Sequence, residues 1–109
     1  SSTRLYANPA ALEDSGKRAR IEDLRLVLES VLEARRRVMV EVNAPADRLD
    51  AVAERLPSMQ EVTVARLFGD AGYALKAAVP RDRLPVVIPA IKAAGGSDVV
   101  VTRVGQIVP

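Results

Sequence analysis

The chain has 109 residues, a length typical of one domain with a short extension, and 16 Lys plus Arg against 14 Asp plus Glu leave a net charge of +2, too small to indicate nucleic-acid or membrane partners. It contains no Cys and no His, which excludes disulfides, zinc centres, thiol nucleophiles and imidazole acid–base catalysis. No apolar run is long enough to span a membrane and the first residues lack the apolar core of a signal peptide, so we expect a cytoplasmic protein.

Residues 17–37 predict a helix of about twenty residues. Its apolar side chains recur at steps of three and four residues: Ile21, Leu24, Leu28 and Val31. Ser15 is the expected N-cap. The three arginines at 35–37 fit the favourable position of cations at a helix C-terminus better than they fit a nucleic-acid contact. This helix needs a partner for its apolar side.

Residues 38–43 alternate valines with Met39 and Glu41, which is the period of a β-strand. Pro45 and Asp47 then predict the start of a helix, because proline suits the first helical position and an acidic side chain favours the positive end. An apolar stripe follows, made of Leu49, Val52, Ala53 and Leu56.

Residues 61–80 predict a β-hairpin. The second arm alternates strictly and the first mostly, with apolar side chains at Val62, Val64, Phe68, Tyr73, Leu75, Ala77 and Val79. Between the arms, Gly69, Asp70 and Gly72 favour the backbone conformations that a short hairpin loop requires.

The strand-proline-aspartate pattern recurs at Pro80 and Asp82 and predicts a second helix. Its stripe repeats the earlier steps with Leu84, Val87, Ile88 and Ile91. Proline inside a helix removes a backbone hydrogen bond, so the helix is expected either to start late, near Pro85, or to kink at Pro89. Gly95 suits a left-handed C-cap.

Residues 98–102 predict the last strand, and residues 103–109 form an apolar tail that we expect to pair at a sheet edge. From residue 38 the order is therefore that of an α+β, ferredoxin-like βαββαβ sandwich with an extra N-terminal helix. Both helices would cover one sheet face. The other face would be open and rich in small and apolar side chains that favour contact with another sheet or subunit: Met39, Glu41, Thr63, Ala65, Leu67, Ala74, Lys76 and Ala78.

Several short motifs, in this order and spacing, carry a family resemblance. They are Val-Met-Val-Glu-Val-Asn-Ala-Pro at 38–45, Thr-Val at 63–64, Gly-Tyr-Ala at 72–74, Val-Pro at 79–80, Ile-Pro at 88–89, Lys-Ala-Ala-Gly at 92–95 and Ile-Val-Pro at 107–109. With them the chain resembles the C-terminal, ACT-like regulatory domain of long-form ATP phosphoribosyltransferase, the first enzyme of histidine biosynthesis. The resemblance implies a connecting segment and helix from the catalytic portion at 1–37 and the ferredoxin-like regulatory domain at 38–109.

The resemblance also implies a function. Such a domain senses L-histidine for allosteric feedback inhibition, contacts its own catalytic domains and helps to assemble a homo-oligomer, a hexamer in the family. Phosphoribosyl transfer from phosphoribosyl pyrophosphate to ATP belongs to the preceding domains, which need Mg²⁺. For this chain alone the resemblance implies no enzyme activity, no catalytic or metal-binding residue and no cofactor.

Carried over position by position, the resemblance implies effector contacts. Asn43 matches the family's Asn or Asp at the strand end, and Thr63 matches the threonine of its Ser/Arg-Pro-Thr motif. Met59, Glu61 and Asp98 occupy aligned positions where contacts are made partly through the backbone. The ordinary alternative is that Asn43 caps the helix at Pro45, Thr63 fills the open face, and the two acidic residues are solvated turn residues.

Two other functions stay open. Glu61 and Val62 stand where the family more usually has Ser-Pro, and a carboxylate there would repel the carboxylate of an amino acid, which suggests a pure assembly domain with a decayed effector site. The strand order also occurs in RNA-binding modules of the RRM type. Those need aromatic side chains on the central strands, where this chain has only Tyr73.

Overall fold

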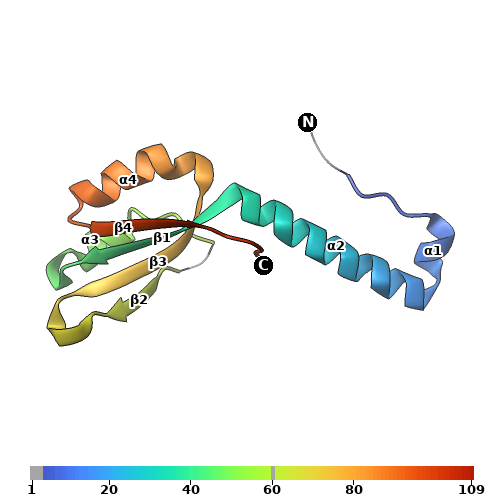
Figure 1. Cartoon of the computed structure of the whole chain (residues 1–109), viewed down its shortest axis with the longest axis horizontal. Helices are drawn as coiled ribbons and strands as arrows, with labels where there is room; N and C mark the ends of the chain where they lie inside the picture. Colours follow the sequence, from blue (N-terminus) through green and yellow to red (C-terminus); the bar gives the residue numbers. More distant parts are fainter. Residues whose placement is uncertain (1–3, 60) are drawn as a thin grey trace.

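The computed structural model describes residues 4–59 and 61–109, so residues 1–3 of the predicted connecting segment lie outside it. The helices are α1 (Pro9–Glu13), α2 (Ser15–Arg36), α3 (Leu49–Ala53) and α4 (Leu84–Ala93), and the strands are β1 (Arg37–Ala44), β2 (Thr63–Arg66), β3 (Tyr73–Pro80) and β4 (Ser97–Arg103). The four strands form one antiparallel sheet in the order β2-β3-β1-β4. This arrangement confirms the predicted ferredoxin-like α+β fold with an added N-terminal helix (Figure 1).

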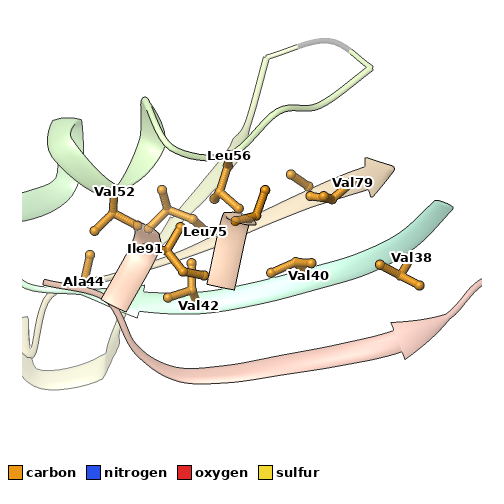
Figure 2. Packing of buried hydrophobic residues seen from close by; sticks show 11 residues of the cluster. Val38, Val40, Val42, Ala44, Val52, Leu56, Leu75, Val79 and Ile91 are labelled. Carbon is orange, nitrogen blue, oxygen red and sulfur yellow. The ribbon is translucent and has the colours of Figure 1, made fainter. Parts of the chain in front are cut away.

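The core lies between the sheet and the helices α3 and α4. Register pairs Val38 with Val79 and Val42 with Leu75, so the alternating apolar side chains of both central strands point to the same face. The buried cluster consists of Val38, Val40, Val42, Ala44, Val52, Leu56, Leu75, Ala77, Val79, Val87 and Ile91. Figure 2 shows Ile91 next to Val42 of β1 and Val52 on the same side of the strand, above Ala44. The predicted inward faces of both central strands are thus confirmed.

The two strand-to-helix connections have the same design, which differs in one respect from the prediction. Pro45 and Pro80 are extended residues before the helix, and each leads into a 3₁₀ turn, Ala46–Arg48 and Arg81–Arg83. The expected single helix from Pro45 is therefore split, because the extended proline leaves a tight turn, closed by Arg48 N–H donating to the Pro45 carbonyl at 2.9 Å, before α3 begins.

Helix α4 begins at Leu84 and carries Pro85 in its first turn, as the late-start prediction had it. A proline there costs no hydrogen bond, because the first N–H groups of a helix have no partner within it. The helix ends in a Schellman motif: Gly95 has φ +108°, its N–H bonds to the Lys92 carbonyl, and the Gly96 N–H bonds to the Ile91 carbonyl. The turn places the chain to enter β4.

The hairpin loop is longer than predicted. Strand β2 ends at Arg66, and Phe68, expected on the strand, lies at the loop tip with a fully exposed side chain. The loop returns through Gly72, whose φ is +118°. A Cβ atom at Gly72 would stand 2.5 Å from the carbonyl oxygen of Ala44, so this position accepts only glycine without a backbone shift.

Helix α2 projects away from the sheet (Figure 1). Its N-cap is Asp14 rather than the expected Ser15, because the Asp14 carboxylate accepts the Lys17 N–H at 2.9 Å. The tail also departs from expectation. It turns back to α2, where the Ile107 N–H donates to the Ser30 carbonyl at 3.1 Å, instead of extending a sheet edge.

Candidate functional site

We call the sheet face opposite α3 and α4 the open face. Its side chains alternate with the buried ones, so the register defines it directly. Met39 lies opposite Ala78, Glu41 opposite Lys76 and Asn43 opposite Ala74, while on the other side of β3 Thr63 lies opposite Lys76 and Ala65 opposite Ala74. The face therefore combines small apolar positions with a few isolated polar ones.

A hollow of about 410 Å³, here the Asn43 hollow, occupies the loop end of the open face. It is lined by Glu41, Asn43, Thr63, Ala65, Ala74, Leu75, Lys76, Asp98 and Val100. Three of the predicted site residues, Asn43, Thr63 and Asp98, thus come together from β1, β2 and β4. Their separation in sequence shows that only the sheet joins them.

A second hollow of about 290 Å³, here the Met59 hollow, adjoins the first. It is lined by Met39, Ser58, Met59, Glu61, Thr63, Lys76, Ala77, Ala78, Ile107, Val108 and Pro109. It holds the other predicted residues, Met59 and Glu61, and shares Thr63 and Lys76 with the Asn43 hollow. All the predicted site residues therefore line one continuous stretch of the open face.

Asp98 reaches the site through an irregularity in β4. Between Glu41 and Asn43 the pairing of β1 with β4 shifts register, and Asp98 has φ +52°. Aspartate tolerates this left-handed conformation better than most residues, and such bulges often redirect a side chain next to a site. The Asp98 carboxylate accepts a long hydrogen bond of 3.5 Å from the Asn43 amide and another of 3.5 Å from the Ser97 hydroxyl.

The structure separates the ordinary alternatives for these residues. Pro45, and not Asn43, holds the N-cap position of the 3₁₀ turn, and no side chain caps it, so the capping role expected for Asn43 is wrong. Asp98 lies in a strand rather than a turn. Glu61 is exposed just before β2, Thr63 lies on the open face, and both line the Met59 hollow.

Lys76 is the residue that sequence reasoning left out of the site. It lies between Glu41 on β1 and Thr63 on β2, and it lines both hollows. The signal was present: within the strict alternation of residues 73–79, Lys76 is the only charged side chain, and it falls on the outward face.

The site can bind polar ligands, but it offers no group of three or more Asp or Glu side chains that would hold a metal ion within the described residues. Its carboxylates can accept from an ammonium group, and Asn43, Thr63 and Lys76 can donate to a carboxylate. Tyr73 lies opposite the buried Ala44 and so belongs to the core side of β3, which leaves the open face of the described strands without an aromatic ring. None of the described helices is long and apolar enough to cross a membrane.

Comparison with known proteins gives consistent matches. A family model described as "HisG, C-terminal domain" matches residues 34–106. Over its whole length the chain is 32% identical to an ATP phosphoribosyltransferase of Pelotomaculum thermopropionicum and 34% identical to one of Desulforudis audaxviator, covering 38% of each. It is 37% identical over 97% of its length to that of Nitratidesulfovibrio vulgaris, covering 36% of that protein.

The chain therefore spans little more than a third of the length of these relatives. The matched family range begins near the end of α2 and covers the entire sheet with α3 and α4. It contains the buried core, the whole lining of the Asn43 hollow and every motif except the last, Ile-Val-Pro at 107–109, which also contributes to the Met59 hollow. The chain belongs to the family of HisG C-terminal domains.

Proposed function

We propose that this chain is the regulatory and oligomerisation domain of an ATP phosphoribosyltransferase, and that it senses L-histidine, the end product of the pathway that this transferase begins. The observation that carries the proposal is the gathering of Asn43, Met59, Glu61, Thr63 and Asp98 along two adjoining hollows. These residues come from separate strands and connections. Their proximity in sequence therefore does not account for their common location, and this location supports the proposal.

The chemistry of the hollows suits an amino acid. Its ammonium group needs carboxylate or carbonyl acceptors, its carboxylate needs donors, and its side chain needs one further polar partner. Asp98 and Glu61 supply acceptors, and the hydroxyl of Thr63 and the amide of Asn43 supply donors. Apolar walls from Met39, Ala74 and Ala78 complete the surroundings.

The helix α2 would then connect the sensor to the catalytic portion. Its side chains Leu24, Leu26 and Leu28 are 53%, 49% and 42% exposed. Apolar exposure of this extent along a helix favours a protein partner. In this proposal residues 1–37 contact the catalytic domains, residues 38–109 bind the effector, and copies assemble into a homo-oligomer. Inhibition would follow from unequal affinity of L-histidine for two assembled states.

Calorimetric titration with L-histidine tests the proposal. We expect saturable heat with the wild-type protein. Glu61→Ser is titrated beside it, with Glu54→Ser as a matched control, because Glu54 is an exposed carboxylate at the end of α3, on the opposite side of the sheet. Absence of heat in wild type and in Glu61→Ser would remove the sensing role.

The second candidate is an assembly domain whose effector site has decayed. It is favoured by Glu61, an exposed carboxylate in the Met59 hollow where the family more usually has serine. Heat with Glu61→Ser but none with wild type would support this candidate. Sedimentation equilibrium then measures the oligomeric state. For an assembly domain we expect a defined oligomer whose mass is the same with and without L-histidine.

A further inference from the structure

Lys76 is the central charge of the open face. It is paired across β3 with Glu41 on one side and Thr63 on the other, and it is one of the two residues shared by the Asn43 and Met59 hollows. Among the described residues that line these hollows it is the only cation, while Glu41, Glu61 and Asp98 are anions. The site is therefore a single positive centre with negative groups around it.

The ammonium group of Lys76 has no hydrogen-bond or ion-pair partner among residues 4–59 and 61–109. A lysine opposite a glutamate on a neighbouring strand often forms an ion pair across the strands. Within the described residues, however, no nitrogen–oxygen pair of 4.0 Å or less joins Lys76 to Glu41 or to Glu61, and Lys76 donates no hydrogen bond. Although Lys76 lies opposite Glu41 in the register, its positive charge is thus available to a ligand.

This arrangement matches the charges of a zwitterion. An α-amino acid carries one carboxylate and one ammonium group on the same carbon, so its binding site needs one cation with anions close by. Glu61 alone would repel the carboxylate of such a ligand, but Lys76 lines the same hollow and offsets that repulsion. The departure of Glu61 from the family's serine therefore does not by itself abolish binding.

We infer that Lys76 binds the carboxylate of the amino-acid effector and thereby selects amino acids over the corresponding amines. The inference rests on the proposed function and adds to it the residue that determines this specificity. Thr63, beside Lys76 on β2, lies where its hydroxyl can bind the same carboxylate.

The test compares L-histidine with histamine, which keeps the imidazole and the amine but lacks the carboxylate. Both are titrated by calorimetry into wild type, Lys76→Met, Lys76→Arg and Lys92→Met. Lys92→Met is the matched control, since Lys92 is an exposed lysine on α4, on the opposite side of the sheet. Because Lys76 is exposed and Ala74 and Ala78, its neighbours on the same face of β3, are small, the methionine variant is expected to fold, and circular dichroism checks this.

We expect Lys76→Met to bind L-histidine roughly tenfold more weakly, the usual size of a lost charge-assisted hydrogen bond, and to bind histamine at least as well as wild type does. Lys76→Arg keeps most of the affinity for L-histidine, and Lys92→Met keeps all of it. The wild-type preference for L-histidine over histamine should disappear only in Lys76→Met.

Unchanged L-histidine binding in Lys76→Met would overturn the inference while leaving the proposed function intact. An equal loss for L-histidine and histamine would overturn it as well, because Lys76 would then support the pocket rather than read the carboxylate. Failure of wild type to bind L-histidine removes the proposed function and the inference together, so the three results are distinguishable.

Discussion

Helices α2 and α4 carry the same kind of apolar stripe and have opposite surroundings. In α4, Val87 and Ile91 are 2% and 0% exposed, whereas in α2, Leu24 and Leu28 are 53% and 42% exposed. The sheet has one face for helices, and α3 and α4 occupy it (Figure 1). The period of the apolar residues thus predicts that one side of a helix can be buried. Whether that side is buried depends on a partner surface that no other helix already covers.

The two regions are joined firmly at the start of β1. The Arg37 guanidinium, which is 21% exposed, bonds to the Glu33 carboxylate at 3.0 Å and to the Ala78 carbonyl at 3.1 Å. One side chain thereby links the last turn of α2 to β3. The projecting helix is attached to the sheet at this end by defined contacts, and its apolar side remains available along most of its length.

The largest difference in stability between the two regions is expected when one leucine in each is shortened to alanine. Leu75→Ala deletes a side chain that is 0% exposed in the core, and we expect it to cost about 3 kcal/mol of unfolding free energy. Leu24→Ala on α2 should cost less than about 0.5 kcal/mol, because it leaves no cavity. Urea unfolding followed by circular dichroism measures both. Similar losses for the two variants would show that α2 is packed in solution.

Two glycines of the hairpin loop, Gly72 and Gly69, compare the stability cost of an added methyl group at a crowded and at an open position. Gly72→Ala should cost about 2 kcal/mol, because the added methyl meets the Ala44 carbonyl and the backbone is in a left-handed region. Gly69→Ala, at φ +70° with no atom within 4 Å of the added methyl, should cost about half as much from the conformation alone. Denaturant midpoints report both values. Equal costs would mean that the contact with β1 is unimportant.

The N-cap of α2 tests whether the arm folds together with the sheet. Asp14→Ala removes the acceptor for the Lys17 N–H and should destabilise the helix by about 1 kcal/mol. If α2 is a separate unit in this chain, hydrogen exchange speeds up in its first turns and not in β1 or β3. Faster exchange in both regions would instead indicate one cooperative unit. Ser15→Ala, one residue away, serves as the control.

The smallest effect is expected at the tail. Ile107→Pro removes the N–H that donates to the Ser30 carbonyl and should cost about 0.5 kcal/mol. Its clearer readout is local, namely lower NMR order parameters for residues 104–109. Val108→Pro is the matched control, because within the described residues the Val108 N–H makes no hydrogen bond. Equal changes in both variants would argue against this contact in solution.

Local rules were sufficient for most of the fold. The alternation of 73–79 predicted which side of β3 is buried, and the recurrence of proline and aspartate predicted two equivalent strand-to-helix connections. The predictions that these rules got wrong concern the ends of single elements. Asp14 and Ser15 are both good caps, and the exact loop length around Phe68 depends on where β2 stops pairing with β3.

Side-chain period, turn chemistry and family motifs in the amino-acid sequence were enough to predict the main strands and helices, their order, and Asn43, Met59, Glu61, Thr63 and Asp98 as candidate site residues. Only the tertiary structure decided that Asn43, Thr63 and Asp98 line one hollow, that Lys76 is shared with the next, and that the tail lies on α2. The first two depend on strand register, the first also on the bulge at Asp98, and the third on a hydrogen bond between the tail and α2. Such contacts join residues far apart in the chain, and no local pattern specifies them.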